Sequence, residues 1–308
     1  MIKAPPTPKG FRDITPELAK RRRETMGKIA DVLEDSGFVP LETPIVEFAE
    51  TLTGKYGEEA DRLIYEFTDR GGRKLALRYD LTVPLARFVA SNLGLIQGKA
   101  FRRYQIGEVF RGDNPQKGRF RQFTQFDMDS VGSEDLKEDA TIIATALKAA
   151  KAAGLKNPVM YINDRTNFQS VSADVVRIID KLDKIGDEGV IKELAEKGIK
   201  NASEVLTDIK NKQPTEQLQT ILNYLKEMGV SDNEVKFTPT LARGLDYYTG
   251  MIIELRDTAY GDLSLGGGGR YDNLIGMFVY PEQSRRAGKD IPAVGFSFGI
   301  DRILEALE

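Results

Sequence analysis

Arginines are concentrated in one segment of the chain, residues 101–129, which reads FRRYQIGEVFRGDNPQKGRFRQFTQFDMD. Residues 99–121 contain seven Lys or Arg, and their acidic residues are Glu108 and Asp113. The planar guanidinium group of arginine binds phosphate oxygens through paired, charge-assisted hydrogen bonds. The segment therefore predicts a site for a phosphate-containing ligand. The alternative is an ordinary solvated surface.

Two other segments carry polar groups at spacings suited to a small ligand. Residues 78–82 (RYDLT) place the carboxylate of Asp80 and the hydroxyl of Thr82 at a strand end, where they could bind an ammonium group. The alternative for Asp80 is a role in forming a turn. Residues 241–250 (LARGLDYYTG) put one cation, one anion and two phenols between glycines. Here the alternative is a core-edge strand whose tyrosine hydroxyls reach water.

Glycine and arginine recur towards the end of the sequence. Residues 266–272 (GGGGRYD) contain four consecutive glycines, which permit close approach of a ligand or a tight crossing of strands. They lack the spacing of the GxGxxG and GxxxxGK[ST] nucleotide motifs. Residues 295–302 (GFSFGIDR) place Arg302 in the first turn of a closing helix, where the helix N-terminus already favours anions. Arg302 is therefore a second candidate for binding phosphate, or else an exposed arginine paired with a neighbouring carboxylate.

Three residue types, Cys, His and Trp, do not occur in the 308 residues. Their absence excludes Ser-His-Asp and Cys-His catalysis and removes the commonest side chains for metal sites. A chain of average composition and this length would hold several of each. The joint absence indicates a reduced-alphabet, reconstructed or otherwise engineered sequence, with compositional chance as the alternative.

Charge and hydropathy restrict the partners of the chain. The formal net charge is -3, so any contact with nucleic acid must use a local basic patch. No apolar segment follows a basic start, and no run approaches about 18 apolar residues, so we expect neither secretion nor a membrane span. We expect a soluble cytoplasmic protein.

The elements that hold these groups follow from capping and periodicity. Thr15 and Pro16 predict the start of an amphipathic helix that ends at Asp35. Ser133 can cap an alanine-rich helix that reaches about Ala153. The arginine-rich segment predicts a β hairpin whose turn is polar and rich in glycine. Further strands are expected at residues 37–47, 157–164, 251–257 and 293–299, with a glycine-rich turn before the last of them and a closing helix after it. Another strand is expected to begin at Lys74, and the chain to turn helical after a bend at Thr82–Pro84.

Residues 166–236 differ from the rest, because they are rich in Lys, Glu, Asp, Ile and Leu at helical spacing. We interpret them as a helical insertion. Elsewhere helices are separated by runs of strands, without a regular βαβ alternation. The predicted fold class is α+β, with a mainly antiparallel sheet flanked by helices.

Taken in order, these segments resemble the catalytic core of class II aminoacyl-tRNA synthetases, in particular the histidyl-tRNA synthetase branch, over residues 1–308. LETPIVE is similar to the first class II motif, which forms the dimer. Residues 101–129 resemble the second motif and GFSFGIDRIL the third. LARGLDYYTG and GGGGRYD resemble two signatures of the histidine branch. The resemblance implies an enzyme that activates histidine with ATP, forms a homodimer and binds the acceptor stem of tRNA(His).

The resemblance also implies roles for individual residues. The catalytic cations would be Arg111 and Arg243. ATP, with Mg²⁺ bridging its phosphates, would be bound by Arg111, Asp113, Arg119, Phe123 and Arg302. Histidine would be bound by Asp80, Thr82, Gln125, Asp129, Arg243, Tyr247, Tyr248 and Tyr271. In adenylation an ionised carboxylate attacks the α-phosphate, so a chain without histidine can carry out the reaction by positioning and charge.

Two departures from the family pattern bear on function. Thr124 stands where the family often has His between the Phe and Gln of the second motif. The sequence ends at Glu308, after the third motif, and the family's anticodon-binding domain has no counterpart in it, so we expect transfer to tRNA(His) to be weak. The alternative is a synthetase-like, histidine-sensing regulatory subunit of ATP phosphoribosyltransferase, which shares the fold and lacks that domain.

Overall fold

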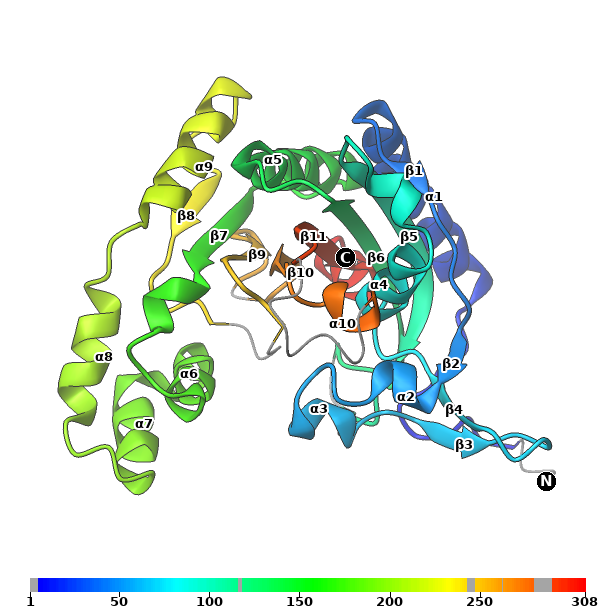
Figure 1. Cartoon of the computed structure of the whole chain (residues 1–308), viewed down its shortest axis with the longest axis horizontal. Coiled ribbons are helices and arrows are strands. Elements are labelled where there is room, and N and C mark those ends of the chain that lie inside the picture. The colour runs from blue at the N-terminus through cyan, green and yellow to red at the C-terminus, as the bar shows by residue number, and fades with distance from the viewer. Residues whose placement is uncertain (1–4, 116–117, 243–246, 262, 280–289) are drawn as a thin grey trace.

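The computed structural model of the chain describes residues 5–115, 118–242, 247–261, 263–279 and 290–308 (Figure 1). Within these ranges, eight strands form one large sheet. Their order is β1 (Val39–Pro40), β5 (Phe101–Phe110), β6 (Gln122–Val131), β11 (Ala293–Gly299), β10 (Gly266–Arg270), β9 (Met251–Asp257), β7 (Pro158–Asp164) and β8 (Val235–Phe237).

The large sheet is mainly antiparallel. The end pairs β1–β5 and β7–β8 are parallel, and the pairs between them are antiparallel. The longest pair is the β5–β6 hairpin, which runs from Phe101 opposite Val131 to Phe110 opposite Gln122. The predicted hairpin and the predicted α+β class are both confirmed.

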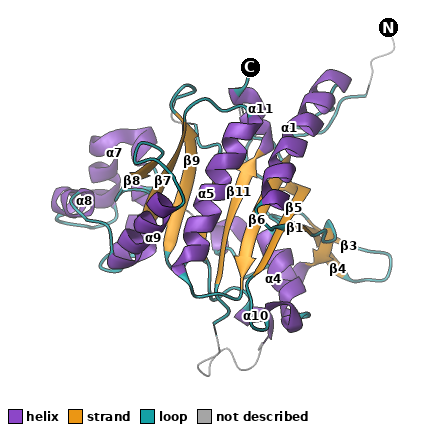
Figure 2. Cartoon of the chain, turned by 90° about the horizontal axis from the view of Figure 1, so that it is seen from above, coloured by secondary structure: helices purple, strands orange, loops and turns teal. Residues whose placement is uncertain are grey.

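One face of the large sheet is covered by α1 (Pro16–Asp35), α5 (Leu136–Ala153), α9 (Glu216–Glu227) and α11 (Ile300–Ala306) (Figure 2). The core beneath this helix layer includes Phe126, Met128, Phe296 and Phe298, which are all buried. Burial of such side chains stabilises a fold by roughly 1.5–3 kcal/mol each. Among the described helices, none is long and apolar enough to cross a membrane.

The helix caps test the predicted helix starts. Thr15 caps α1 as predicted, because its side chain accepts a hydrogen bond from the backbone N–H of Leu18. The prediction that Ser133 caps α5 is wrong. The cap is Asp135, whose side chain accepts from the N–H of Lys137, while the Ser133 hydroxyl accepts from the N–H of Asp135.

A small antiparallel sheet has the order β2 (Val46–Phe48), β4 (Lys74–Leu77) and β3 (Glu66–Thr68). The strand predicted at residues 37–47 is interrupted by prolines and is divided between the two sheets. β1 ends at Pro40, and β2 begins after Pro44. The chain then passes from β4 into α4 (Thr82–Ala90), as the sequence predicts. Figure 1 shows the β3–β4 hairpin projecting from the body of the molecule. The short helices on this side are α2 (Ala49–Leu52), α3 (Glu58–Asp61), η1 (Leu93–Ile96) and α10 (Gly276–Val279).

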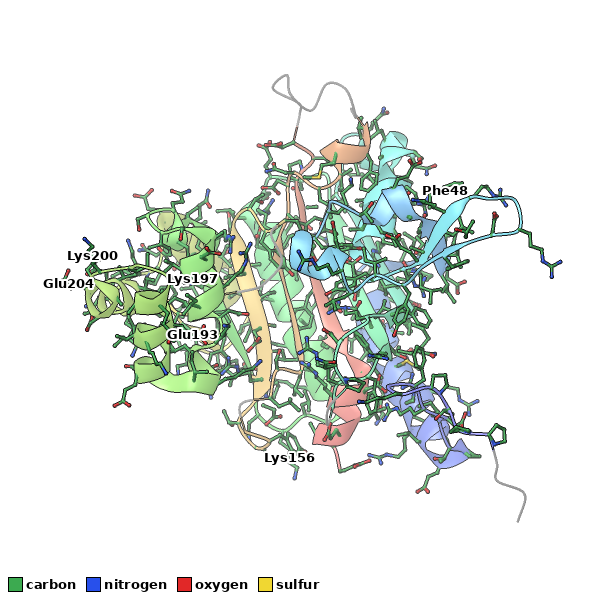
Figure 3. All side chains as sticks on the ribbon, turned by 90° about the horizontal axis from the view of Figure 1, so that it is seen from below. Phe48, Lys156, Glu193, Lys197, Lys200 and Glu204 are labelled. Carbon is green, nitrogen blue, oxygen red and sulfur yellow. The ribbon has the colours of Figure 1, made fainter. Side chains whose placement is uncertain are left out.

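The segment interpreted as an insertion is helical. It contains η2 (Arg165–Phe168), α6 (Ala173–Ile179), α7 (Leu182–Glu196), α8 (Ala202–Lys210) and then α9 and β8. The helices α6 to α8 lie beyond the β8 end of the large sheet, and Figure 3 labels Lys200 and Glu204 at their outer edge. By contrast, α9 packs on α5 and shares its core.

The glycine-rich run is a strand, so the predicted turn between residues 257 and 293 is wrong at this point. β10 lies in the middle of the large sheet, between β9 and β11. A Cβ atom on Gly266 would fall 2.6 Å from the Phe296 ring, and one on Gly269 would fall 2.9 Å from the Tyr248 ring. Phe296 on β11 and Tyr248 before β9 thus occupy the space that side chains on β10 would need, so glycine fits there.

Candidate active site

Strand β6 presents a row of polar side chains on the sheet face opposite the helix layer. Gln125, Asp127 and Asp129 alternate with Phe126 and Met128, which belong to the core under α5. Strand β11 adds little bulk to this polar face, because the residues paired with the row are Gly299, Ser297 and Gly295. The row therefore forms a polar floor on which a ligand can lie.

Asp80 lies beside this floor, in the turn between β4 and α4. Its Oδ1 accepts hydrogen bonds from the Tyr56 hydroxyl at 2.9 Å and from the N–H of Val83 at 3.0 Å. Its buried Oδ2 has no hydrogen-bond partner among the described residues. Burial raises the pKa of Asp80, and the nearby Arg111 guanidinium opposes the rise. An unpaired carboxylate oxygen here is suited to an ammonium group, with Thr82 opening the next helix alongside.

Gln125 and Asp127 are linked through Ser297. The Gln125 side chain donates from Nε2 to the Ser297 hydroxyl at 2.9 Å, and that hydroxyl also bonds to the Asp127 carboxylate. Two buried oxygens, Gln125 Oε1 and Asp127 Oδ1, have no hydrogen-bond partner in the described part of the chain. Buried polar atoms are usually paired, so this cluster indicates a place for a ligand.

Asp129 has a hydrogen bond on Oδ1 and an ion pair on Oδ2, and Oδ2 has no hydrogen-bond partner among the described residues. The Tyr271 hydroxyl donates to Oδ1 at 2.5 Å, and Arg103 Nη2 lies 2.8 Å from Oδ2. Burial raises the pKa of Asp129, and the Arg103 charge and the Tyr271 hydrogen bond lower it. Gly295 is required opposite it, because a Cβ atom there would fall 1.9 Å from Asp129 Oδ1.

Buried tyrosines form the wall around the floor. The Tyr247 ring centroid lies 4.8 Å from that of Tyr248 and 6.0 Å from that of Tyr271. Tyr56 and Tyr79 form a second pair at 4.8 Å. Burial raises the pKa of Tyr247, so its phenol is neutral at physiological pH. The three tyrosines that the sequence predicts for a histidine site therefore pack against one another.

Arg111 follows β5 and reaches over the aromatic rings. Its Nε donates to the Tyr79 carbonyl at 3.1 Å, and its guanidinium carbon lies 4.3 Å from the Tyr79 centroid and 5.2 Å from the Phe123 centroid. In the hairpin loop, Asp113 and Arg119 pair with each other, with Arg119 Nη2 3.1 Å from Asp113 Oδ2. These residues bring a cation and an aromatic face to the open end of the polar floor.

Arg302 lies in the first turn of α11, directly after β11. Its Nη1 donates to the Ser264 carbonyl at 2.9 Å. A Cβ atom on Gly299 would lie 3.6 Å from Arg302 Cδ, and Gly299 pairs with Gln125. Arg302 thus lies beside the same floor as Gln125. The predicted Arg243 falls in residues 243–246, outside the described residues.

The arginines of the β5–β6 hairpin do not all serve a ligand. Arg102 forms a paired contact with Glu138 on α5, with bonds of 2.9 and 2.7 Å. Arg103 is fully buried beside Asp129. These two guanidinium groups neutralise internal carboxylates, so they are not available to the phosphate ligand that the segment predicts. Arg111 is the strand-end arginine that faces the site.

A charged cluster on the helix side of the sheet joins α11 to β6. Asp301 accepts from Arg22 Nη1 at 2.5 Å and from the backbone N–H of Thr124 at 3.0 Å, and Arg12 also pairs with it. Arg22 further bonds to the Thr124 hydroxyl. This cluster fixes the backbone between Phe123 and Gln125 relative to the helix that carries Arg302.

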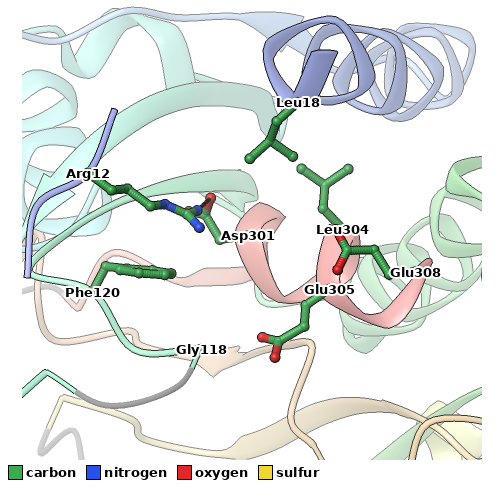
Figure 4. Close-up of a pocket in the computed structure, with 8 residues that line it drawn as sticks. All are labelled: Arg12, Leu18, Gly118, Phe120, Asp301, Leu304, Glu305 and Glu308. Atoms are coloured by element: carbon green, nitrogen blue, oxygen red, sulfur yellow. Dashed lines mark hydrogen bonds and ion pairs between the residues drawn. The ribbon is translucent and has the colours of Figure 1, made fainter. Parts of the chain in front are cut away.

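A separate cavity of about 250 Å³ opens beside this cluster (Figure 4). None of the predicted site residues lines it; its lining consists of Arg12, Leu18, Gly118, Phe120, Asp301, Leu304, Glu305 and Glu308. Figure 4 shows Arg12 reaching Asp301 next to the Phe120 ring. Among the described residues, no group of three or more acidic side chains is arranged to hold a metal ion.

Four residues of the pocket escaped sequence reasoning: Tyr56, Arg103, Asp127 and Ser297. Asp127 carried a usable signal, because a strand places residue 127 on the same face as residues 125 and 129. Ser297 carried the same signal within β11. Tyr56 and Arg103 could not be found that way, because their partners Asp80 and Asp129 are distant in the sequence.

Comparisons with known proteins agree with this geometry. A family model described as histidyl-tRNA synthetase matches residues 10–184 and 189–303. The histidine–tRNA ligase of Aeropyrum pernix is 44% identical, with 98% of this chain and 74% of that protein covered. The crystal structure of histidyl-tRNA synthetase from Nostoc sp. PCC 7120 superimposes with a TM-score of 0.81 at 31% identity, covering 100% of this chain and 76% of that one. A Bacillus halodurans structure described as an ATP phosphoribosyltransferase regulatory subunit/histidyl-tRNA synthetase gives 0.78 at 25% identity, covering 98% and 83%.

Proposed function

Because the chain belongs to the histidyl-tRNA synthetase family, we propose that its polar sheet face activates histidine with ATP and passes the histidyl group to tRNA(His). One observation carries the proposal. Gln125 and Asp127 on the polar sheet face, and Asp80 beside it, each keep a buried oxygen without a hydrogen-bond partner among the described residues, and the Arg111 guanidinium lies near Asp80.

The reaction has two steps. The carboxylate of histidine attacks the α-phosphorus of ATP, forming histidyl-adenylate while pyrophosphate leaves. A terminal ribose hydroxyl of the tRNA then attacks the carbonyl carbon, and AMP leaves. The first step needs no protein base, because the nucleophile is already ionised. What the protein supplies is alignment of the reactants and positive charge near the phosphate oxygens.

The site divides into an amino-acid end and a nucleotide end. We assign the ammonium group of histidine to Asp80, Thr82 and Gln125. The imidazole lies between Asp129, Tyr271 and the Tyr247–Tyr248 wall. These assignments are supported by the unpaired oxygens of Asp80 and Gln125 and by the burial of the tyrosines.

At the nucleotide end, Arg111 binds the α-phosphate and Phe123 stacks on adenine. Arg302 covers the other face of the base, and Asp113 and Arg119 lie on the loop that closes over the triphosphate. The position of the Arg111 guanidinium near the Phe123 ring supports this arrangement. Arg243 is the second proposed catalytic cation, by its place in the LARGLDYYTG segment. Mg²⁺ would bind with ATP, where phosphate oxygens and water supply most of its ligands.

We also propose that the chain forms a homodimer through the segment that contains LETPIVE. Large apolar side chains are exposed there and on the adjoining β3, namely Val39, Ile45, Val46, Phe48 and Phe67. Figure 3 shows Phe48 at the edge of the small sheet, and half of this side chain is exposed. Contiguous exposed apolar surface of this kind marks a protein interface.

The regulatory-subunit alternative has one observation in its favour, the similarity to the Bacillus halodurans structure. It is less supported, because the ligase of Aeropyrum pernix is more similar in sequence over the same share of the chain. A histidine sensor also has no need for cations such as Arg111 beside an aromatic ring at the nucleotide end.

ATP–pyrophosphate exchange tests the proposal, with each of the twenty amino acids supplied in turn. We expect histidine alone to support exchange. Arg111→Ala should lower the rate about a hundredfold, by analogy with the loss of one transition-state donor. The control Arg177→Ala removes an exposed arginine on α6 that pairs with Asp174, and it should leave the rate unchanged. Histidine binding without exchange by the wild-type chain would support the sensor alternative instead.

A further inference from the structure

Asp127 and Asp129 are two buried carboxylates that share one buried guanidinium. They lie two residues apart on the same face of β6; Arg103 on β5 forms an ion pair with Asp129, and its charge also acts on Asp127. Asp129 Oδ1 accepts from the Tyr271 hydroxyl, and Asp129 Oδ2 is held by the ion pair with Arg103 but has no hydrogen-bond partner among the described residues. Asp127 keeps one buried oxygen, Oδ1, without a hydrogen-bond partner in the described part of the chain. The pair therefore holds one more negative charge than its guanidinium neutralises.

The groups around Asp127 come from four elements. Besides Asp129, they are Arg103 on β5, Ser297 on β11, Tyr271 after β10, and Arg78 and Asp80 in the turn after β4. Arg78 is held elsewhere, because it donates to the carbonyls of Glu108 and Thr43, each at 2.8 Å. The pKa of Asp127 is raised to about 7, chiefly by burial and also by the charges of Asp129 and Asp80, while Arg103 and the Ser297 hydrogen bond oppose the rise.

We propose that Asp127 is a further specificity-determining residue, whose unpaired oxygen binds one ring nitrogen of the substrate imidazole while Asp129 accepts from the other, with a single proton shared between Asp127 and the ring. This inference rests on the proposed function and deepens it. Side chains two residues apart on a strand are separated by about 7 Å along the strand, which an imidazole with a hydrogen bond at each nitrogen can span.

The shared proton follows from the chemistry of imidazole. A neutral ring has one N–H, so its other nitrogen would direct a lone pair at a second carboxylate. One proton, placed either on the ring or on Asp127, removes that repulsion and gives both nitrogens a hydrogen bond. The same proton offsets the excess negative charge of the pair. An amino acid whose side chain cannot share a proton in this way, such as glutamine or asparagine, is therefore rejected.

The proposal predicts a pH dependence with two arms. Free Asp127 and free imidazole both titrate near neutral pH. At pH 8.5 both have lost their protons, so histidine binding must take up one proton. At pH 5.5 both carry one, so binding must release one proton. Histidine affinity should be greatest near pH 7 and fall by up to about tenfold per pH unit on either side.

Isothermal titration of histidine into the wild-type dimer, in buffers of different ionisation enthalpy, measures this proton count directly. We expect uptake approaching one proton at pH 8.5. Asp127→Asn should abolish the uptake and flatten the alkaline arm, since an amide cannot hold the proton. As a matched control, Glu138→Gln removes a buried carboxylate that is paired with Arg102 and Ser130, and it should keep the uptake.

Thermal unfolding of the variants shows whether they are folded. The proton uptake of the wild type tests the inference even if a variant does not fold. Absence of proton uptake by the wild type at pH 8.5, or its persistence in Asp127→Asn, would overturn the inference. Histidine-dependent ATP–pyrophosphate exchange by the same wild-type preparation separates a failure of the proposed role of Asp127 from a failure of the proposed function. If exchange occurs without proton uptake, only the role of Asp127 is wrong. If exchange does not occur, the proposed function itself is wrong.

Discussion

Replacing Asp127 with asparagine should make the folded chain more stable at alkaline pH, although the residue lies in the candidate site. Asp127 is buried, and burial raises its pKa to about 7 from the usual 3.8. At pH 8.5 the folded protein must hold this carboxylate charged, and the unfolded chain holds it charged in water without that cost. Asparagine removes the charge and leaves Arg103 paired with Asp129.

The sign and size of this change in the free energy of unfolding follow from proton linkage. Between pH 4 and 7 the folded chain keeps a proton on Asp127 that the unfolded chain has lost, so the wild type loses stability as the pH rises through this range. The slope is about 1.4 kcal/mol per pH unit. Between pH 5 and pH 8.5 this slope applies only up to pH 7, the pKa of Asp127 in the folded chain, which is about two pH units. The free energy of unfolding of the wild type should therefore fall by about 3 kcal/mol relative to that of Asp127→Asn.

Urea unfolding of both proteins at pH 5 and pH 8.5 measures this change. Comparing the two proteins at each pH cancels the titrating groups that do not interact with Asp127, and the remaining change belongs to Asp127 together with its neighbours Asp129 and Asp80. A stability difference that does not vary with pH, or one that favours the wild type more at pH 8.5, would refute the reasoning. It would mean that Asp127 is charged in the folded protein throughout this range.

Three further predictions concern other parts of the molecule. Asp301→Asn should lower the free energy of unfolding by about 3 kcal/mol in urea titrations, because it leaves the mostly buried Arg22 without its closest carboxylate; unchanged stability would contradict this. Arg111→Lys should recover only part of the exchange rate lost in Arg111→Ala, since lysine lacks the planar fork, and kinetics that equal the wild type would argue against paired contacts to phosphate. Gly295→Ala should weaken histidine binding in calorimetry and destabilise the fold by about 1–3 kcal/mol, because the new Cβ would fall 1.9 Å from Asp129 Oδ1.

Much of the architecture could be predicted, because its signals are local. The β5–β6 hairpin joins two long runs of strand-forming residues through a polar turn, and tertiary contacts did not overturn that pattern. The Thr15 cap and Pro16 likewise fix the start of α1 within a few residues. Such features depend on a residue and its near neighbours in the sequence.

The errors arose where distant residues decide the outcome. Four glycines favour a turn by propensity, yet β10 is a central strand, because Phe296 and Tyr248 occupy the space that side chains on it would need. Arg103 looked like a phosphate ligand, and burial beside Asp129 gives it an internal partner instead. The sequence contains both residues but does not show that they meet.

The central claim is that one sheet face holds histidine and ATP together. A crystal structure of the chain with histidine and a non-hydrolysable ATP analogue tests it most directly. We predict the imidazole within hydrogen-bond distance of Asp129 and Asp127, the ammonium group on Asp80, and the α-phosphate on Arg111. Histidine bound away from the β6 row, or a nucleotide that does not reach Arg111, would contradict the account.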